Sequence, residues 1–181
     1  SLMHGLRAIG AWSDDRAANL LDGGAPFYRS YETSDGRYMA VGAIEPQFYA
    51  SLLDGLDLVG EDLPGQYDRS GWSELHERFT GAFLTATQAE WTERFAGSDA
   101  CVAPINDLGA ATDDPHMRAR GAFVEVGGIT QPAPAPRFSR TAAATPGPPR
   151  PPGADTAQVL MEAGLSEAEI DRLRSAGAIG Q

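Results

Sequence analysis

A proline-rich segment near the end of the chain sets the strongest limit on how the chain folds. Residues 132–153 contain eight of the thirteen prolines, three arginines and no acidic residue. Proline fixes φ and lacks a backbone donor, so this composition disfavours helix and sheet interior alike. We interpret residues 131–153 as a linker. In polyproline geometry it would span roughly 70 Å, enough to return the chain to a distant surface.

The segment before the linker has the pattern of a small α+β domain over residues 21–130. Two aromatic and branched runs, 27–31 and 37–41, flank Asp35-Gly36, a pair that accepts positive φ and predicts a hairpin. Helices are expected at 46–55, 72–84 and 88–95, the last with Thr87 and Glu90 as a capping box. We expect shorter pieces as well: a strand at 100–103 stopped by Pro104, helical turns at 106–111 and 115–120, and a hairpin at 122–131 around Gly127-Gly128.

Both ends of the chain are expected to be helical. Apolar spacing predicts helix over residues 3–21, broken near Ser13-Asp14, and we interpret residues 1–20 as a lead-in from a preceding N-terminal domain. After the linker, residues 154–181 are expected to form a helical hairpin, with Gly164 as a stop and Ser166 to Glu169 as a capping box. Its few apolar residues cannot form a core of their own, so we expect it to dock elsewhere.

Charge and composition exclude several classes of function. The 14 basic and 25 acidic residues give a net charge of −11, which disfavours nucleic acid and anionic lipid as partners. All fourteen basic residues are arginine, so a lysine Schiff base is excluded. One cysteine and three scattered histidines offer neither a disulfide nor a metal site. No apolar run is long enough for a membrane span. A cytoplasmic location fits best.

Glu45 is the most informative candidate for chemistry. It ends a predicted strand and precedes Pro46, which favours extended backbone and places its carboxylate at a helix N-terminus. A carboxylate held there could accept a hydrogen bond from an imidazole and fix its tautomer, as in catalytic pairs. The alternative, favoured on spacing alone, is that Glu45 only caps its own helix.

Two further features allow both a functional and a structural interpretation. Gly23-Gly24 could let the backbone approach a substrate closely, although a glycine pair more often just forms a tight turn. Cys101 lies in an apolar run and is expected to be a small buried residue, because no histidine is near enough in sequence to suggest a thiolate nucleophile.

Five stretches of the sequence together resemble alpha-methylacyl-CoA racemases of the family III CoA-transferase superfamily. They span nearly the whole chain and are Asn19–Tyr28 (NLLDGGAPFY), Asp35–Tyr49 (DGRYMAVGAIEPQFY), Ser98–Pro104 (SDACVAP), Pro134–Phe138 (PAPRF) and Gly164–Ile170 (GLSEAEI). Members of this family are about twice as long, which implies a missing N-terminal large domain. That domain holds most of the CoA site and the histidine and aspartate that act as acid and base.

The resemblance also implies roles for residues of this chain. Glu45 matches the family's active-site glutamate, which partners the catalytic histidine, and we take it as the catalytic candidate. Leu21, Tyr28 and Ile44 fall where the small domain lines the acyl pocket. With Gly23 and Gly24 they form our predicted substrate-binding set. No metal or separate cofactor is implied, because CoA is part of the acyl-CoA thioester substrate. Family members form interlocked dimers, so a homodimer is expected.

The predicted activity is inversion of the centre next to a CoA thioester, through proton removal to an enolate and return on the other face. We expect the chain alone to be incomplete and inactive. One alternative is a family III CoA transferase, which uses a carboxylate nucleophile in the missing half. The transferase branch has a longer glycine loop than Asp22–Pro26, which favours the racemase branch. The other alternative is a non-enzymatic role in binding or assembly.

Overall fold

The computed structural model describes residues 2–180 and divides the chain into two compact units. The first unit ends at Asp107 and the second begins at Leu108. Within the described residues there are eight α-helices and two antiparallel sheets, one of three strands and one of two. The predicted α+β fold is therefore confirmed.

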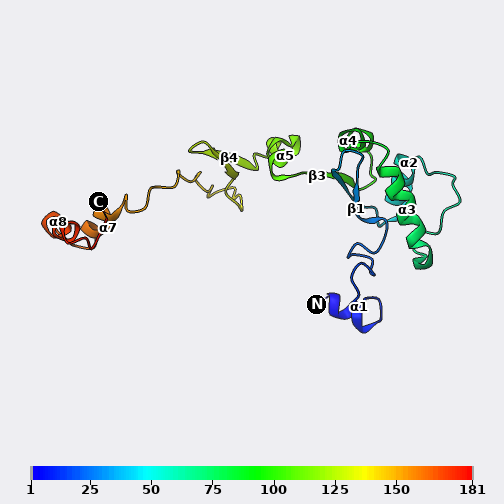
Figure 1. The fold of residues 1–181 in the computed structure, drawn as a ribbon, viewed down its shortest axis with the longest axis horizontal. Helices are drawn as coiled ribbons and strands as arrows, with labels where there is room; N and C mark the ends of the chain where they lie inside the picture. Colours follow the sequence, from blue (N-terminus) through cyan, green and yellow to red (C-terminus); the bar gives the residue numbers. More distant parts are fainter. Residues whose placement is uncertain (1, 181) are drawn as a thin grey trace. The chain divides into compact units, whose positions relative to one another are not determined.

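The first unit is built around the three-stranded sheet (Figure 1). Strands β1 (Tyr28–Glu32), β2 (Tyr38–Gly42) and β3 (Val102–Ile105) are antiparallel neighbours in that order, with Tyr31 opposite Met39 and Met39 opposite Pro104. The helices of this unit are α1 (Leu2–Ala8), α2 (Pro46–Gly55), α3 (Trp72–Phe83) and α4 (Gln88–Phe95), with a short 3₁₀ turn, η1 (Arg69–Gly71), before α3. Helix α4 begins with the predicted capping box of Thr87 and Glu90.

Helices cover only one face of this sheet. Side chains alternate along a strand, so Tyr31, Met39 and Val41 enter the core, where Tyr31 stacks on Phe83 at 5.0 Å between ring centroids. The helices contribute further buried residues, Leu52, Leu75, Phe79, Phe83 and Trp91. The residues of the opposite face, Tyr28, Ser30, Tyr38, Ala40, Ala103 and Ile105, are exposed. The sheet therefore has an uncovered face.

The predicted first hairpin is present, but its loop is not a two-residue Asp35-Gly36 turn. Glu32 and Tyr38 form the last strand pair, and within the loop Gly36 donates its N–H to the Thr33 carbonyl at 3.0 Å. Of the predicted turn pair, only Gly36 has positive φ, at 73°. Asp35 instead accepts hydrogen bonds from the Thr33 hydroxyl and, at 3.2 Å, from the backbone N–H of Gln88, which ties the loop to α4.

Two predictions of secondary structure are wrong. The helix expected over 17–21 is absent, because the Asp22 carboxylate accepts the backbone N–H groups of Ala18 and Asn19 and so competes with helix formation. The strand expected at 100–103 runs over Val102–Ile105 and includes Pro104. Because β3 lies at an edge of the sheet, the missing N–H of Pro104 is tolerated there.

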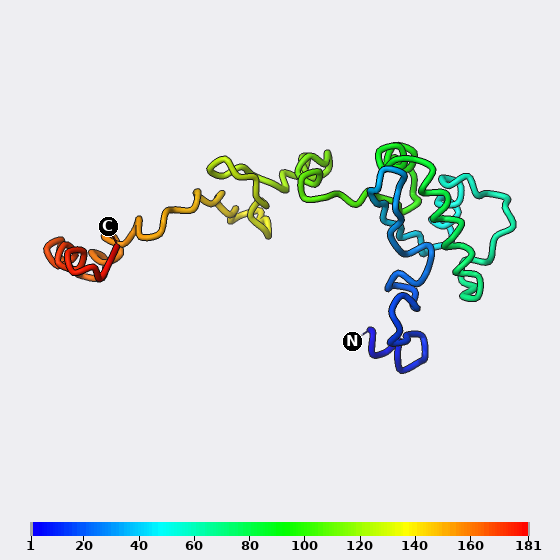
Figure 2. The backbone as a smooth tube through the Cα atoms, viewed as in Figure 1, coloured from blue at the N-terminus to red at the C-terminus, as the bar shows by residue number. Residues whose placement is uncertain are grey.

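The second unit begins with α5 (Leu108–Asp113) and α6 (Pro115–Ala119), followed by the predicted hairpin of β4 (Phe123–Val126) and β5 (Ile129–Pro132). Both turn residues of this hairpin, Gly127 and Gly128, have positive φ. The chain then has no helix or strand over residues 133–155 (Figure 2). Arg137 donates to the carbonyls of Arg120 and Gly121, which fixes the start of this segment against the end of α6.

The unit ends in the predicted helical hairpin, α7 (Thr156–Glu162) and α8 (Glu167–Ser175). Gly164 has φ of 95°, and the N–H of Leu165 donates to the Leu160 carbonyl at 3.0 Å, as expected for a glycine stop. Ser166 and Glu169 form the capping box of α8. Of the helices described over residues 2–180, none is long and apolar enough to cross a membrane.

Candidate functional site

A hollow of about 680 Å³ lies across the uncovered face of the three-stranded sheet. The sheet contributes Tyr28, Arg29, Ser30, Ala40, Val41, Gly42 and Ala103, and the preceding loops contribute Arg16, Ala17, Asp22, Gly23 and Cys101. The volume is within the range of small-molecule sites, and one wall is the bare sheet. The structure brings two of the predicted site residues, Gly23 and Tyr28, together in this sheet hollow.

Leu21 lies in a second hollow of about 360 Å³. Its lining is mainly apolar and aromatic and consists of Leu6, Ala11, Trp12, Leu20, Leu21, Tyr67, Arg69 and Trp72. The single loop that carries Leu21, Gly23 and Gly24 therefore presents Leu21 and Gly23 to different hollows, and Gly24 lines neither of the two. Sequence order alone gave no sign of this division.

Ile44 lines neither hollow in the part of the chain that the structure describes. Its side chain is partly buried, and its carbonyl accepts hydrogen bonds from the side-chain amide of Gln66 at 2.8 Å and the hydroxyl of Tyr67 at 2.5 Å. Tyr67 also lines the apolar hollow that contains Leu21. Ile44 is thus connected to that hollow through Tyr67.

Glu45 has the extended backbone that the following proline predicts, with φ −72° and ψ 145°, and it is the N-cap residue of α2. The Glu45 carbonyl accepts the N–H of Tyr49 at 2.9 Å, but its carboxylate makes no capping hydrogen bond within the described residues. The side chain is exposed. Glu45 therefore occupies the N-cap position through its backbone, and its carboxylate does not cap the helix by a hydrogen bond among the described residues.

Cys101 is exposed, which corrects the expectation that it is buried. Its backbone has φ of 52° just before β3 begins, and its carbonyl accepts the N–H of Gly42 at 2.9 Å, while the neighbouring Ala100 enters the core instead. Partial burial, together with the negative charges of Glu45 and Asp99, raises the pKa of the Cys101 thiol. Cys101 lines the sheet hollow, so the Glu45 carboxylate contributes to the electrostatic environment of one of its lining residues.

The glycine pair forms a tight turn that requires a glycine at each position for a different reason. Gly23 has φ of 90°, and a Cβ at Gly24 would lie 2.7 Å from both the backbone N and the backbone O of Asn19. Asp22 accepts the N–H of Gly24 at 3.1 Å. Burial alone raises the pKa of Asp22, but hydrogen bonds from the Asn19 side-chain amide and from three backbone N–H groups lower it below its ordinary value.

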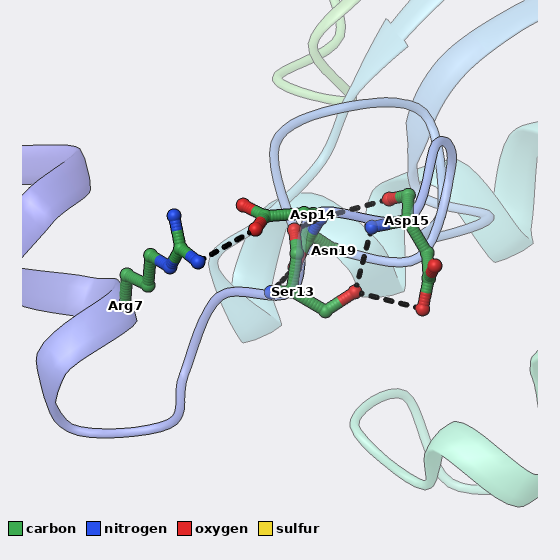
Figure 3. Close-up of polar contacts among 5 residues, drawn as sticks. All are labelled: Arg7, Ser13, Asp14, Asp15 and Asn19. Atoms are coloured by element: carbon green, nitrogen blue, oxygen red, sulfur yellow. Dashed lines mark hydrogen bonds and ion pairs between the residues drawn. The ribbon is translucent and has the colours of Figure 1, made fainter.

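The side chain of Asn19 organises this loop, and sequence reasoning missed it. Asn19 lies beside Ser13 and Asp15, and Arg7 of α1 pairs with Asp14 nearby (Figure 3). The Asn19 side chain also donates to Asp22. Asn and Asp three residues apart before a glycine pair are typical of side-chain-stabilised turns, so the signal was present in the sequence.

The charges around the sheet hollow are mixed. Arg16 and Arg29 line it beside Asp22. Arg29 has its Cζ 5.8 Å from the centroid of the Tyr31 ring, and its Nε is buried without a hydrogen-bond partner among the described residues. In residues 2–180 no group of three or more His, Cys, Asp or Glu residues is arranged to hold a metal ion.

Residues 6–156 match the model of CoA-transferase family III, and the chain belongs to that family. It is 47% identical to mouse (Mus musculus) alpha-methylacyl-CoA racemase and 42% identical to the human (Homo sapiens) protein of that name, over 92% of this chain in each case. The chain spans 44% of the length of each relative.

Other matches are more distant in sequence. Human succinyl-CoA:glutarate CoA-transferase is 29% identical over 85% of this chain and 37% of its own length. Among solved structures, a CaiB/BaiF family protein from Brucella suis has the same fold, with a TM-score of 0.69, 15% identity and coverage of 90% of this chain and 44% of that protein. The Mycobacterium tuberculosis protein Rv3272 matches with a TM-score of 0.57 at 22% identity, over 72% of this chain and 39% of that protein.

Proposed function

We propose that this chain is the C-terminal portion of an alpha-methylacyl-CoA racemase, which inverts the 2-methyl centre of acyl-CoA thioesters. The observation that carries the proposal is 47% and 42% identity to two proteins of that name, over 92% of the chain. The reaction removes the proton at C2 to give an enolate and returns a proton on the opposite face. CoA is part of the substrate, so the proposal includes no separate cofactor.

In this proposal Glu45 is the catalytic contribution of the chain. Its carboxylate is exposed, makes no capping bond among the described residues, and acts electrostatically on a residue of the sheet hollow. It would accept a hydrogen bond from an imidazole of the N-terminal half, which fixes the imidazole tautomer and stabilises its protonated form. The acid and base that move the proton belong to that half, so the chain alone is inactive.

The substrate-binding residues have separate roles. Gly23 lines the sheet hollow and brings its backbone close to the thioester. Tyr28 lines the same hollow. Leu21 offers apolar contact for the acyl chain from the second hollow, and Ile44 is tied to that hollow through Tyr67. The sheet hollow has one open side, which the large domain would close. A homodimer, with the large domain supplied by a second subunit, fits this need.

The transferase alternative receives less support from the relatives. The succinyl-CoA:glutarate CoA-transferases of human and mouse are 29% and 28% identical to this chain, well below the racemases. The transferase branch has a longer glycine loop, whereas Gly23 and Gly24 form a short turn in which Gly24 packs closely on Asn19. A purely binding role predicts no chemistry even when the N-terminal half is supplied.

The proposal is tested with a joined protein, in which the N-terminal half of the mouse relative precedes this chain. A 2-methylacyl-CoA is incubated in D₂O with the joined protein or with the 181-residue chain. We expect deuterium at C2 only with the joined protein, because the chain lacks the acid and base. Exchange by the chain alone, above a boiled control, would contradict the proposed division of roles.

Glu45→Gln in the joined protein tests the catalytic assignment. Loss of the carboxylate should lower kcat for C2 exchange by about 10-fold to 1000-fold, because the imidazole is less well oriented. The thermal unfolding midpoint should stay unchanged, since the side chain makes no capping bond. Glu74→Gln, at an exposed acid in the first turn of α3, is the matched control and should retain normal kcat.

A further inference from the structure

Asn19 is almost fully buried, with 1% of its surface exposed, although it lies in a loop without helix or strand. Its side-chain oxygen accepts the N–H of Ser13 at 2.8 Å (Figure 3). Its side-chain nitrogen donates to the carbonyl of Ser13 at 3.1 Å, to Asp22 Oδ2 at 2.6 Å and more weakly to the carbonyl of Asp15 at 3.5 Å. Both ends of the amide are therefore satisfied, as a buried amide requires.

The backbone of Asn19 is held just as firmly. Its N–H donates to Asp22 Oδ1 at 2.8 Å, and its carbonyl accepts the N–H of Ala25 at 3.3 Å. Gly24 lies so close to this backbone that no side chain fits there, and its N–H donates to the same Asp22 oxygen at 3.1 Å. Asn19, Asp22 and Gly24 thus form one closed unit, the Asn19 clamp.

One member of the clamp, Asp22, belongs to the lining of the sheet hollow, whereas Asn19 lies behind the lining residues. Asp22 and Gly23 line the sheet hollow, and Leu20 and Leu21 line the apolar hollow. Asn19 lines neither. Four consecutive site-lining residues therefore take their direction from one buried residue beside them. Tyr28, at the start of β1, follows the clamp after three residues, all of them buried: Ala25, Pro26 and Phe27.

We propose that Asn19 is a positioning residue for the acyl thioester, acting through Asp22 and the Gly23-Gly24 turn. This inference rests on the proposed function. The clamp orients the loop so that Gly23 faces the sheet hollow and Leu21 faces the apolar hollow. It acts on substrate binding rather than on proton transfer, because the catalytic candidate Glu45 lies on a different element, at the N-cap of α2.

The test compares three variants of the joined protein. Asn19→Asp places a second carboxylate against Asp22, so repulsion should open the clamp. The double variant Asn19→Asp with Asp22→Asn keeps one amide and one carboxylate in the pair, so it should restore the bond between these two side chains while the Ser13 carbonyl loses its donor. Trp91→Phe removes an indole hydrogen bond to the Phe83 carbonyl at 2.8 Å. It weakens the same unit away from both hollows and serves as the control for lost stability.

All variants are assayed at a temperature at which circular dichroism shows them fully folded. For Asn19→Asp we expect KM for a 2-methylacyl-CoA to rise about tenfold or more while kcat changes less than about threefold, and the double variant to reverse part of the rise in KM. Trp91→Phe should keep the KM of the unchanged protein. A purely structural role predicts that Asn19→Asp and Trp91→Phe both lower the unfolding midpoint and both leave KM unchanged.

Calorimetric binding of a non-reactive thioether analogue of the substrate separates this inference from the proposed function. If the unchanged joined protein binds the analogue but exchanges no proton at C2, the proposed racemase function is rejected. Weaker binding by Asn19→Asp would then still support the positioning role. Unchanged binding and KM in Asn19→Asp would overturn the positioning role whatever the activity. If the unchanged protein binds no analogue, both are overturned.

Discussion

The side-chain amide of Gln88 donates a hydrogen bond to the backbone carbonyl of Tyr38 at 2.7 Å. The same amide nitrogen donates to the Ile105 carbonyl at 3.0 Å, so the first residue of α4 joins the ends of β2 and β3. Gln88 is 5% exposed. A single buried amide therefore holds the helix layer against the end of the sheet.

Gln88→Glu should destabilise the chain by about 3 kcal/mol at pH 7, because a buried carboxylate would face two carbonyl oxygens. The loss should be smaller at pH 4, where a protonated carboxyl can donate to one carbonyl. Urea unfolding at both pH values measures this. Gln47→Glu, on the exposed first turn of α2, is the control and should change stability by less than about 0.5 kcal/mol.

Two buried tyrosines should respond in opposite ways to loss of the hydroxyl. The Tyr31 hydroxyl donates to the Pro26 carbonyl at 2.7 Å, whereas the buried Tyr49 hydroxyl has no partner among the described residues. We expect Tyr31→Phe to cost about 1 kcal/mol and Tyr49→Phe to be neutral or stabilising. Denaturant midpoints of the two variants provide the measurement. Equal losses would mean that the Tyr49 hydroxyl has a partner in solution.

The adjacent glycines should differ sharply in their tolerance of a methyl group. Gly24→Ala brings a Cβ to 2.7 Å from two backbone atoms of Asn19, and we expect it to cost about 3 kcal/mol or prevent folding of the loop. At Gly23 there is open space, so Gly23→Ala should cost only about 1 kcal/mol for its positive φ. Thermal unfolding of both variants tests the order, and a reversed order would contradict the close packing of Gly24 on Asn19.

Asp22 should make stability fall in acid. Its pKa is lowered in the folded chain from the ordinary value of 3.8, so its contribution is complete above that value and is lost as pH falls through the lower folded value. Asp22→Asn should therefore lose less stability than the unchanged chain between pH 5 and pH 2, measured by urea unfolding. Other carboxylates with lowered pKa, such as Asp35 and Glu90, remain in both proteins and cancel in the comparison.

Local patterns in the sequence predicted local structure well. The capping boxes at Thr87 and Ser166, the turn at Gly127-Gly128 and the extended backbone of Glu45 each depend on neighbours within a few residues. These features depend only on residues that are close together in the sequence, so they can be predicted from it.

Features that depend on distant segments were not predicted. Gln88 bonds to strands 17 and 50 residues away, and no pattern around it signals those partners. Cys101 is exposed and lies just before β3, which begins at Val102, two residues later than its apolar run suggests. The division of Leu21 and Gly23 between two hollows depends on the Asn19 clamp. Tertiary contacts determine each of these three features, so local propensity could not predict them.

The configuration at C2 of the thioester tests the central claim most directly. The joined protein is given either the 2R or the 2S form of a 2-methylacyl-CoA, with glutarate present as an acceptor acid, and the products are separated by chiral chromatography. We predict that both forms reach the same mixture of epimers and that no glutaryl-CoA appears. Retained configuration at C2 together with transfer of CoA to glutarate would contradict the racemase account and identify a CoA transferase.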